Sequence, residues 1–137
     1  MVLTIGDEGW TGMEVMALMA REHIELLVDV RSRPSGGTPE LDYDQFRPKV
    51  RERGVRYSYM GDLFGKLGDA EPDAEKILSG AVRVASGASR WRVLVFGGCE
   101  DPRGTTRREV VAWALLQLGC KVKHVRAGGR IEEDPGF

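Results

Sequence analysis

Short runs of apolar residues alternate along the chain with segments in which apolar positions recur at helical spacing. This alternation is typical of strands that are connected through helices. The apolar runs predict strands at residues 2–5, 25–30, 55–59, 91–96 and 121–125. Within these runs there is no strict alternation of apolar and polar residues, which indicates strands that are buried on both faces. That pattern favours a parallel sheet.

The helical segments carry recognisable start signals. Thr11 and Glu14 form a capping-box pattern at the beginning of a helix predicted for residues 11–22. Its apolar positions at helical spacing are interpreted as facing the core, and they are Met13, Met16, Ala17 and Ala20. Further helices are predicted at 42–53, 72–86 and 105–118, and a glycine-rich loop at 60–68.

Together these elements predict one α/β domain that spans residues 1–137. We expect a three-layer, Rossmann-like fold with a mostly parallel central sheet of about five strands. The segment 127–137 is predicted to be either a loose tail or an additional edge strand. The pattern of apolar and polar residues does not reveal the order of the strands in the sheet.

Composition excludes some classes of protein. Twenty Lys and Arg residues against twenty-one Asp and Glu residues give a net charge of −1, which argues against a protein that wraps duplex nucleic acid. Two cysteines, Cys99 and Cys120, without a secretory signal indicate a reducing cytoplasm and free thiols. No apolar stretch is long enough for a membrane helix. Two scattered histidines and the lack of a paired-cysteine motif predict no metal site, and we expect no cofactor.

Several predicted strands end in polar or glycine-rich turns. In an open parallel sheet, ligands bind beyond the carboxyl ends of the strands. The turns at 6–10, 31–33, 61–66 and 97–102 are therefore expected to meet at one edge of the sheet. Glycines in these turns would let a ligand approach the backbone, and they are Gly6, Gly61, Gly65, Gly97 and Gly98.

The start of the helix predicted at 105–118 suggests an anion site. Three arginines crowd it, where positive charge opposes the helix dipole: Arg103, Arg107 and Arg108. A bound oxyanion would offset this charge, and its predicted ligands are Arg107, Thr105 and Thr106. Alternatively, the arginines are neutralised in surface ion pairs with Glu100, Asp101 and Glu109.

Arg31 directly follows the strand predicted at 25–30 and is a second candidate ligand of the anion. Its guanidinium offers a fork of N–H donors that matches an oxyanion. The alternative is an arrangement in which Arg31 pairs with nearby Asp29. The segment 31–56 as a whole carries seven basic and four acidic residues and forms a mildly basic face.

Acid–base chemistry in the crevice would require a carboxyl group, and Asp7 and Glu100 are the candidates. Cys99 lies in a crevice loop and His124 near the end of the last predicted strand, so a Cys–His pair is geometrically conceivable. The competing interpretation is a half-buried thiol and an unrelated imidazole. Trp10 is interpreted as a core residue, with stacking on a base or sugar as the alternative.

Several segments together resemble the proteins grouped as domain of unknown function 488. The resemblance rests on residues 3–6, 24–32 and 57–65, on Asp101-Pro102 and on Arg107, and it covers about residues 2–125. It implies the α/β fold and a site at the strand ends. It implies no reaction, because that family has no settled activity.

The chain departs from this family at positions where reactive side chains are expected. Family members tend to carry a Cys-x-Glu after the fourth strand and a Cys-His-Arg at the start of the next helix. An ungapped match places Gly97 and Cys99 at the Cys and Glu positions of the first motif. It places residues 105–107 at the Cys-His-Arg positions of the second, where only the arginine agrees. A shift in register would instead place Cys99 or Glu100 at the positions of the Cys-x-Glu motif. Asp7 replaces a histidine of the family's first loop, so the resemblance implies oxyanion recognition without metal or thiol chemistry.

We therefore predict a cytoplasmic protein that binds a phosphate- or carboxylate-bearing ligand, related to a nucleotide or a nucleic-acid end. The sequence does not decide whether this ligand is also turned over. One alternative is a non-catalytic nucleic-acid-binding module that uses the basic face of 31–56. Another is a dimeric interaction protein whose active site has decayed. No membrane partner is expected.

Overall fold

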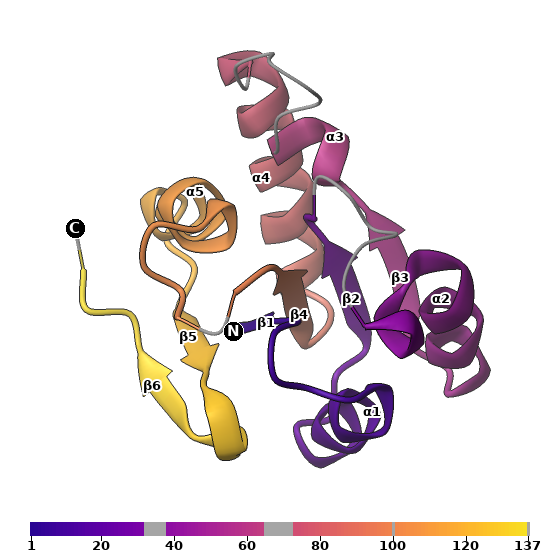
Figure 1. Ribbon diagram of the computed structural model, residues 1–137. Helices are drawn as coiled ribbons and strands as arrows, with labels where there is room; N and C mark the ends of the chain where they lie inside the picture. Colours follow the sequence, from indigo (N-terminus) through magenta and orange to yellow (C-terminus); the bar gives the residue numbers. More distant parts are fainter. Residues whose placement is uncertain (32–37, 65–72, 100, 137) are drawn as a thin grey trace.

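A computed structural model describes residues 1–31, 38–64, 73–99 and 101–136. In these residues a six-stranded sheet is covered by helices on both faces, which confirms the three-layer α/β fold (Figure 1). The strands lie in the order β3-β2-β4-β1-β5-β6. Their bounds are β1 Val2–Gly6, β2 Leu26–Asp29, β3 Arg56–Tyr59, β4 Val93–Gly97, β5 Val122–Val125 and β6 Ile131–Glu133.

The strands β1 to β5, which correspond to the predicted apolar runs, pair with one another in parallel. β6 pairs antiparallel with β5. At the centre of the sheet, Val2–Gly6 of β1 pairs residue by residue with Val93–Gly97 of β4, and every residue of both strands is buried. The segment 127–137 therefore contributes an edge strand, which is one of its two predicted alternatives.

The helices divide between the two faces of the sheet (Figure 1). α1 Gly12–Arg21 and α2 Tyr43–Glu52 cover one face. The other face is covered by α3 Gly61–Phe64, α4 Ala74–Ala88, and a continuous helical segment made of η2 Arg107–Ala112 and α5 Trp113–Gln117. Two short turns complete the described elements, η1 Pro39–Leu41 and η3 Ala127–Gly129. None of the helices in the described part of the chain has the length and apolar character needed to cross a bilayer.

Each face of the sheet has its own hydrophobic core. In β1, Leu3 and Ile5 pack with α1 and α2, whereas Val2 packs with α4 and α5. Successive side chains of a strand point to opposite faces, so burial on both sides requires an unbroken apolar run. Each fully buried aliphatic side chain contributes roughly 1.5–3 kcal/mol to folding. This is the physical reason why the apolar runs predicted the sheet correctly.

The beginning of α1 agrees with the sequence prediction, but of the four residues predicted to face the core only Met16 is buried. The Thr11 side chain accepts from the Glu14 amide, and the Glu14 carboxylate accepts from the Thr11 amide. Met13, however, is 81% exposed, and Ala17 and Ala20 are exposed as well. Besides Met16, the helix buries Gly12, Val15, Leu18 and Met19. Because α1 carries apolar residues on most of its surface, packing against the sheet selects the buried face and local spacing does not.

The predicted glycine-rich loop at 60–68 contains a helical turn, α3, which corrects that prediction. Phe64 at its end is fully buried and lies against α4, where Gly80 leaves room for the ring. A Cβ added at Gly80 would approach Phe64 Cζ to 2.7 Å. This contact joins residues far apart in sequence, so no local pattern signals it. Gly65 lies outside the described residues.

The helix predicted at 105–118 begins with the π-helical turns of η2 and continues as α5. Gly119 follows it with a φ of +83°, a left-handed conformation that glycine adopts without strain. In η2 the consecutive residues Arg107 and Arg108 are 1% and 8% exposed. Both guanidinium side chains are thus drawn into the protein, on the element that follows β4. π-helical turns are frequent at functional sites.

A buried polar network holds the residues after β6 against the sheet. His124 of β5 is fully buried, and its Nε2 lies 2.6 Å from Asp134 Oδ2, while its Nδ1 contacts the Thr4 hydroxyl. Because the carboxylate is an acceptor, we infer that Nε2 carries the proton and that Nδ1 accepts from Thr4. Arg108 donates to the same carboxylate at 3.2 Å and to the Gly136 carbonyl at 2.8 Å.

Candidate functional site

A cavity of about 370 Å³ lies at the carboxyl ends of β2 and β4. Its place follows from the path of the chain. α1 and α2 follow β1 and β2 on one face of the sheet, whereas η2 follows the intervening strand β4 on the other face (Figure 1). The loops that leave the carboxyl ends of these neighbouring strands therefore run to opposite faces of the sheet. Open α/β sheets bind ligands at the place where the loops separate in this way. We call this cavity the crevice; it is lined by Val30, Arg31, Gly97, Gly98, Cys99, Gly104, Thr105, Thr106 and Arg107.

Most of the predicted anion ligands come together in the crevice. Those that line it are Arg31, Gly97, Gly98, Thr105, Thr106 and Arg107. Gly6 and Gly61 do not line it, but a Cβ added at either would collide with the carbonyl of a lining residue, Cys99 or Arg31. Glu100, one of the two predicted acid–base groups, lies outside the described residues.

Arg31 is held in place by a buried carboxylate. Its Nε and Nη2 each donate to Asp29 at 3.0 Å, and its Nη1 donates to the Leu41 carbonyl at 2.8 Å. Tyr57 also donates its hydroxyl to Asp29, and burial together with that negative charge raises the pKa of Tyr57 well above its usual value. The Arg31 guanidinium lies 4.5 Å from the centre of the Phe96 ring. The pairing of Arg31 with Asp29 that was the alternative interpretation is therefore present, and it is buried.

Asp7 stands beside this pair at the end of β1. Its amide donates to the Gly97 carbonyl at 2.8 Å, which joins the loops that follow β1 and β4. The Asp7 carboxylate lies 3.7 Å from Arg31 Nη1. Burial raises the pKa of Asp7, although the charge of Arg31 opposes the shift. Asp7 is not among the residues that line the crevice, but it lies next to Arg31, which does, and a carboxyl group with a raised pKa is suited to proton transfer.

The Arg107 side chain packs against the loop that follows β4. Its Nη2 donates to the Cys99 carbonyl at 2.8 Å, and a Cβ added at Gly97 would meet the Arg107 Cδ at 3.0 Å. A Cβ added at Gly6 would collide with the Cys99 carbonyl. These two glycines are thus explained by close packing around Arg107 and its loop. Gly98 differs, because a Cβ there would meet nothing within 4 Å.

The two threonines have different surroundings. The Thr105 hydroxyl donates to the Pro102 carbonyl at 2.6 Å, and the Thr105 carbonyl accepts the amides of Arg108 and Glu109. Thr105 therefore closes the turn that leads into η2. Thr106 is the residue before η2 and has helical backbone angles. Both line the crevice.

The other two arginines of this region form ion pairs, on the surface for Arg103, as the alternative interpretation expected, but in a buried position for Arg108. Arg103 pairs with Asp101 at 2.9 Å on the surface. Arg108 pairs with Glu109 at 2.8 Å and with Asp134 at 3.2 Å. Of the three arginines, it is Arg107 that lines the crevice.

The conceivable Cys99–His124 pair is not formed. Cys99 is exposed in the loop after β4, with a φ of +62°, whereas both ring nitrogens of buried His124 contact Thr4 and Asp134. Both cysteines of the chain are free thiols. Sequence reasoning missed the contact with Asp134, because it exists only after β6 folds back along β5.

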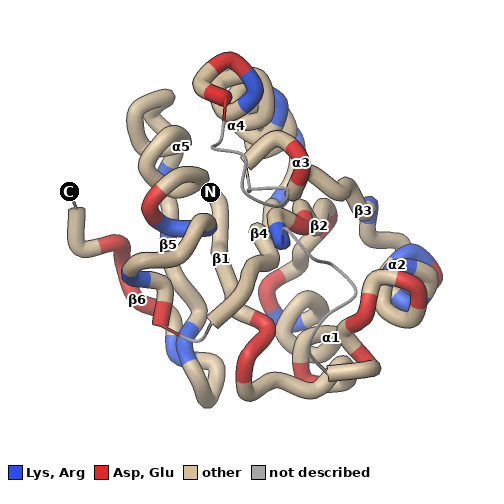
Figure 2. The backbone as a smooth tube through the Cα atoms, turned by 45° about the horizontal axis from the view of Figure 1, so that its top comes forward, with Lys and Arg blue, Asp and Glu red and all other residues tan. Residues whose placement is uncertain are grey.

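The basic face of 31–56 is less continuous than the charge count suggests. Arg31 is withdrawn into the buried pair with Asp29. Arg56 stacks on the Trp91 ring at 4.6 Å, and Arg47 lies 5.6 Å from the centre of the Tyr43 ring. Figure 2 shows basic and acidic residues interspersed along α2. No single-sign surface is therefore built by this element.

Comparisons of the sequence with models of known protein families and with curated proteins find no match. The resemblance to domain of unknown function 488 accordingly stays a prediction from the motifs quoted above. What can be said about function comes from the geometry of the site.

Proposed function

We propose that the protein binds a phosphate- or carboxylate-bearing ligand in the crevice, with a nucleotide or a nucleic-acid end as the ligand class. The observation that carries the proposal is Arg107, a guanidinium that is 1% exposed and lines a cavity of about 370 Å³ at the carboxyl edge of the sheet. A cation in a wall of low dielectric attracts an anion more strongly than the same cation in water.

Arg31 lies in the same wall as Arg107, but its guanidinium is held by Asp29. Asp29 matches the charge of Arg31 through two hydrogen bonds, so this pair adds little net positive charge to the crevice. The role of Arg31 is then to shape the wall and to orient the ligand. Arg107 adds a second buried guanidinium to the wall of the crevice.

Backbone groups support the same interpretation. The Thr105 carbonyl already accepts the amides of Arg108 and Glu109, so the backbone contribution here is the helix dipole, which favours an anion beside the first residue of a helix. The helical segment Arg107–Gln117 has its first residue in the crevice wall, next to Thr106. Open space at Gly98 lets a ligand approach the loop after β4.

If the bound ligand also reacts, Asp7 is the residue that supports acid–base chemistry. Its carboxyl group is partly buried beside Arg31, and its pKa is raised by that burial. A carboxylic acid that keeps its proton to higher pH can donate it to a leaving group.

The test compares Arg107→Ala with Arg103→Ala in titrations with inorganic phosphate and with adenosine monophosphate, followed by calorimetry. Arg103 belongs to the same region, but it pairs with Asp101 on the surface and does not line the crevice. We expect Arg107→Ala to weaken binding about 10- to 100-fold, the effect of losing hydrogen bonds to a charged group. Arg103→Ala is expected to bind like the original protein.

Two results would overturn the proposal: no measurable binding of either anion by the original protein, or equal affinity of the two variants. A thermal melt of each variant checks that it is folded. Titration with short DNA and RNA at several salt concentrations separates a compact anion site from a nucleic-acid surface, which loses affinity steeply as salt rises.

A further inference from the structure

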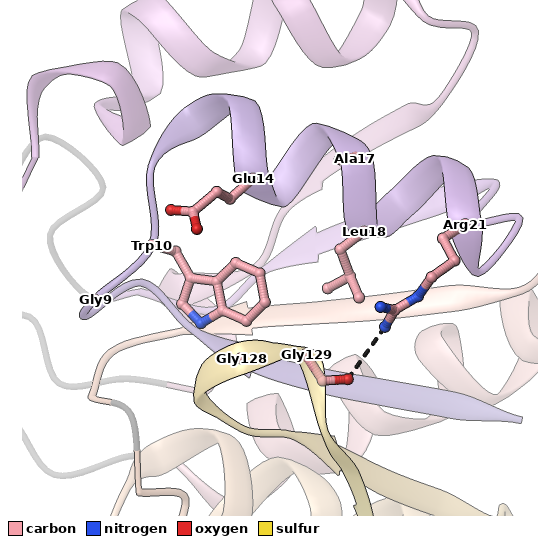
Figure 3. A pocket seen from close by; sticks show the side chains of 8 residues that line it. All are labelled: Gly9, Trp10, Glu14, Ala17, Leu18, Arg21, Gly128 and Gly129. Carbon is pink, nitrogen blue, oxygen red and sulfur yellow. Dashed lines mark hydrogen bonds between the residues drawn. The ribbon is translucent and has the colours of Figure 1, made fainter.

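A second hollow, of about 290 Å³, lies between α1 and the turn η3 that joins β5 to β6 (Figure 3). It is formed by a different set of residues from the crevice. We call it the Trp10 slot; its lining residues are Gly9, Trp10, Glu14, Ala17, Leu18, Arg21, Gly128 and Gly129.

The two walls of the Trp10 slot are of different kinds. One wall is the Trp10 indole, which packs against the core below α1 and lies beside Leu18 in Figure 3. The opposite wall is backbone, at Gly128 and Gly129, with φ angles of +80° and +83°. Other residues would be strained there, and a Cβ at Gly129 would also meet Arg21 Nη1 at 3.1 Å. The backbone conformation of this wall therefore requires glycine at both positions.

The rim of the Trp10 slot offers both an acceptor and a donor. Glu14 accepts the Thr11 amide with Oε1, and Figure 3 shows its carboxylate next to the indole. Arg21 stands at the other end of the slot, where Nη2 donates to the Gly129 carbonyl at 3.2 Å. Glu14 and Arg21 give the rim one acidic and one basic side chain, and Arg21 also pairs with Glu22 at 3.0 Å, so the rim has no excess of positive charge and an uncharged ligand fits it better than an anion.

We propose that the Trp10 slot binds one uncharged heteroaromatic ring system of nucleobase size. The ring stacks on the Trp10 indole, and its polar edge bonds to Glu14 or Arg21. A flat π surface attracts any base, because every base has a π face, and the polar rim fixes its orientation. The slot is too small for a folded segment of another protein but matches the size of a single ring system. This proposal is independent of anion binding in the crevice.

The test is a fluorescence titration with adenosine, guanosine, cytidine and uridine, which carry no phosphate. Trp91 and Trp113 are replaced by Phe, so that Trp10 is the only tryptophan. We expect saturable quenching of Trp10 by at least one nucleoside. In calorimetry, Trp10→Leu is expected to bind that nucleoside about 5- to 100-fold more weakly, the usual effect of removing one stacking partner.

Two matched variants on α1 test the location. Ala17→Phe places a ring in the slot, whereas Met13→Phe adds a ring to an exposed residue of the same helix that does not line it. We expect Ala17→Phe to lower the affinity for the nucleoside by at least about tenfold, the usual effect of losing one good contact. Met13→Phe is expected to keep the affinity of the original protein.

The proposal is overturned if quenching rises linearly without saturation, or if the Ala17→Phe and Met13→Phe variants bind equally well. Arg107→Ala separates the two sites. Nucleoside binding that persists in this variant supports the Trp10 slot, and nucleoside binding that disappears places the ring in the crevice and overturns the proposal. Failure of nucleoside binding leaves the phosphate titrations unaffected.

Discussion

At the scale of single residues, the buried carboxylate of Asp29 organises the crevice. It accepts two hydrogen bonds from the Arg31 side chain and one from the Tyr57 hydroxyl, and it is fully buried. Removing one partner of a buried ion pair leaves the other charge uncompensated, which typically costs about 3–5 kcal/mol. We expect Asp29→Asn to lower the free energy of unfolding by roughly that amount, measured by urea unfolding at pH 7.

Asp101→Asn is the matched control for this prediction. Asp101 also pairs with an arginine two residues away in sequence, but that pair lies on the surface, where solvent screens the charges. We expect little change in its unfolding curve. Equal unfolding midpoints for the two variants would show that burial of the Asp29–Arg31 pair does not matter for stability.

At the scale of elements, Asp134 fastens the edge strand β6 to the rest of the sheet. Its side chain is 3% exposed and accepts from His124, Arg108 and the Gly136 amide. Burial acts to raise the pKa of Asp134, but these hydrogen bonds outweigh it and hold the pKa below its usual value. We expect Asp134→Asn to increase hydrogen exchange in a peptide covering residues 126–136, while β1 and β4 stay protected.

Glu133→Gln is the control for Asp134→Asn, because it removes the same charge from an exposed neighbouring side chain. We expect exchange of the 126–136 peptide to remain as in the original protein. An edge strand without such anchoring opens at low cost in free energy, since few contacts hold it. Unchanged exchange in Asp134→Asn would mean that backbone pairing with β5 is sufficient to hold β6.

At the scale of the whole molecule, the sequence predicted what depends on local signals and strand ends. The capping box at Thr11 and the doubly buried apolar runs predicted α1 and the parallel sheet, and the position of the crevice followed from the sheet. Features that depend on contacts between residues far apart in the sequence could not be predicted. The turn α3 depends on Phe64 packing beside α4, and the partner of His124 arrives only when β6 folds back. The sequence offered both roles for Arg31, and its hydrogen bond to the distant Leu41 carbonyl helps to fix its orientation.

The buried imidazole of His124 makes the stability of the molecule depend on pH. Burial lowers the pKa of His124, and the charges of Arg107 and Arg108 act in the same direction, whereas Asp134 opposes them. In the unfolded chain a histidine titrates near pH 6.5, so below that pH the unfolded state binds more protons than the folded state. The stabilising contribution of neutral His124 is thus complete above about pH 6.5 and is lost as the pH falls through the folded pKa.

We expect the free energy of unfolding to decrease from pH 7 to pH 5, and to decrease less in His124→Gln, as measured by urea unfolding at each pH. Parallel pH profiles for the two proteins would contradict this assignment and would require that the ion pair with Asp134 outweighs the burial of the ring.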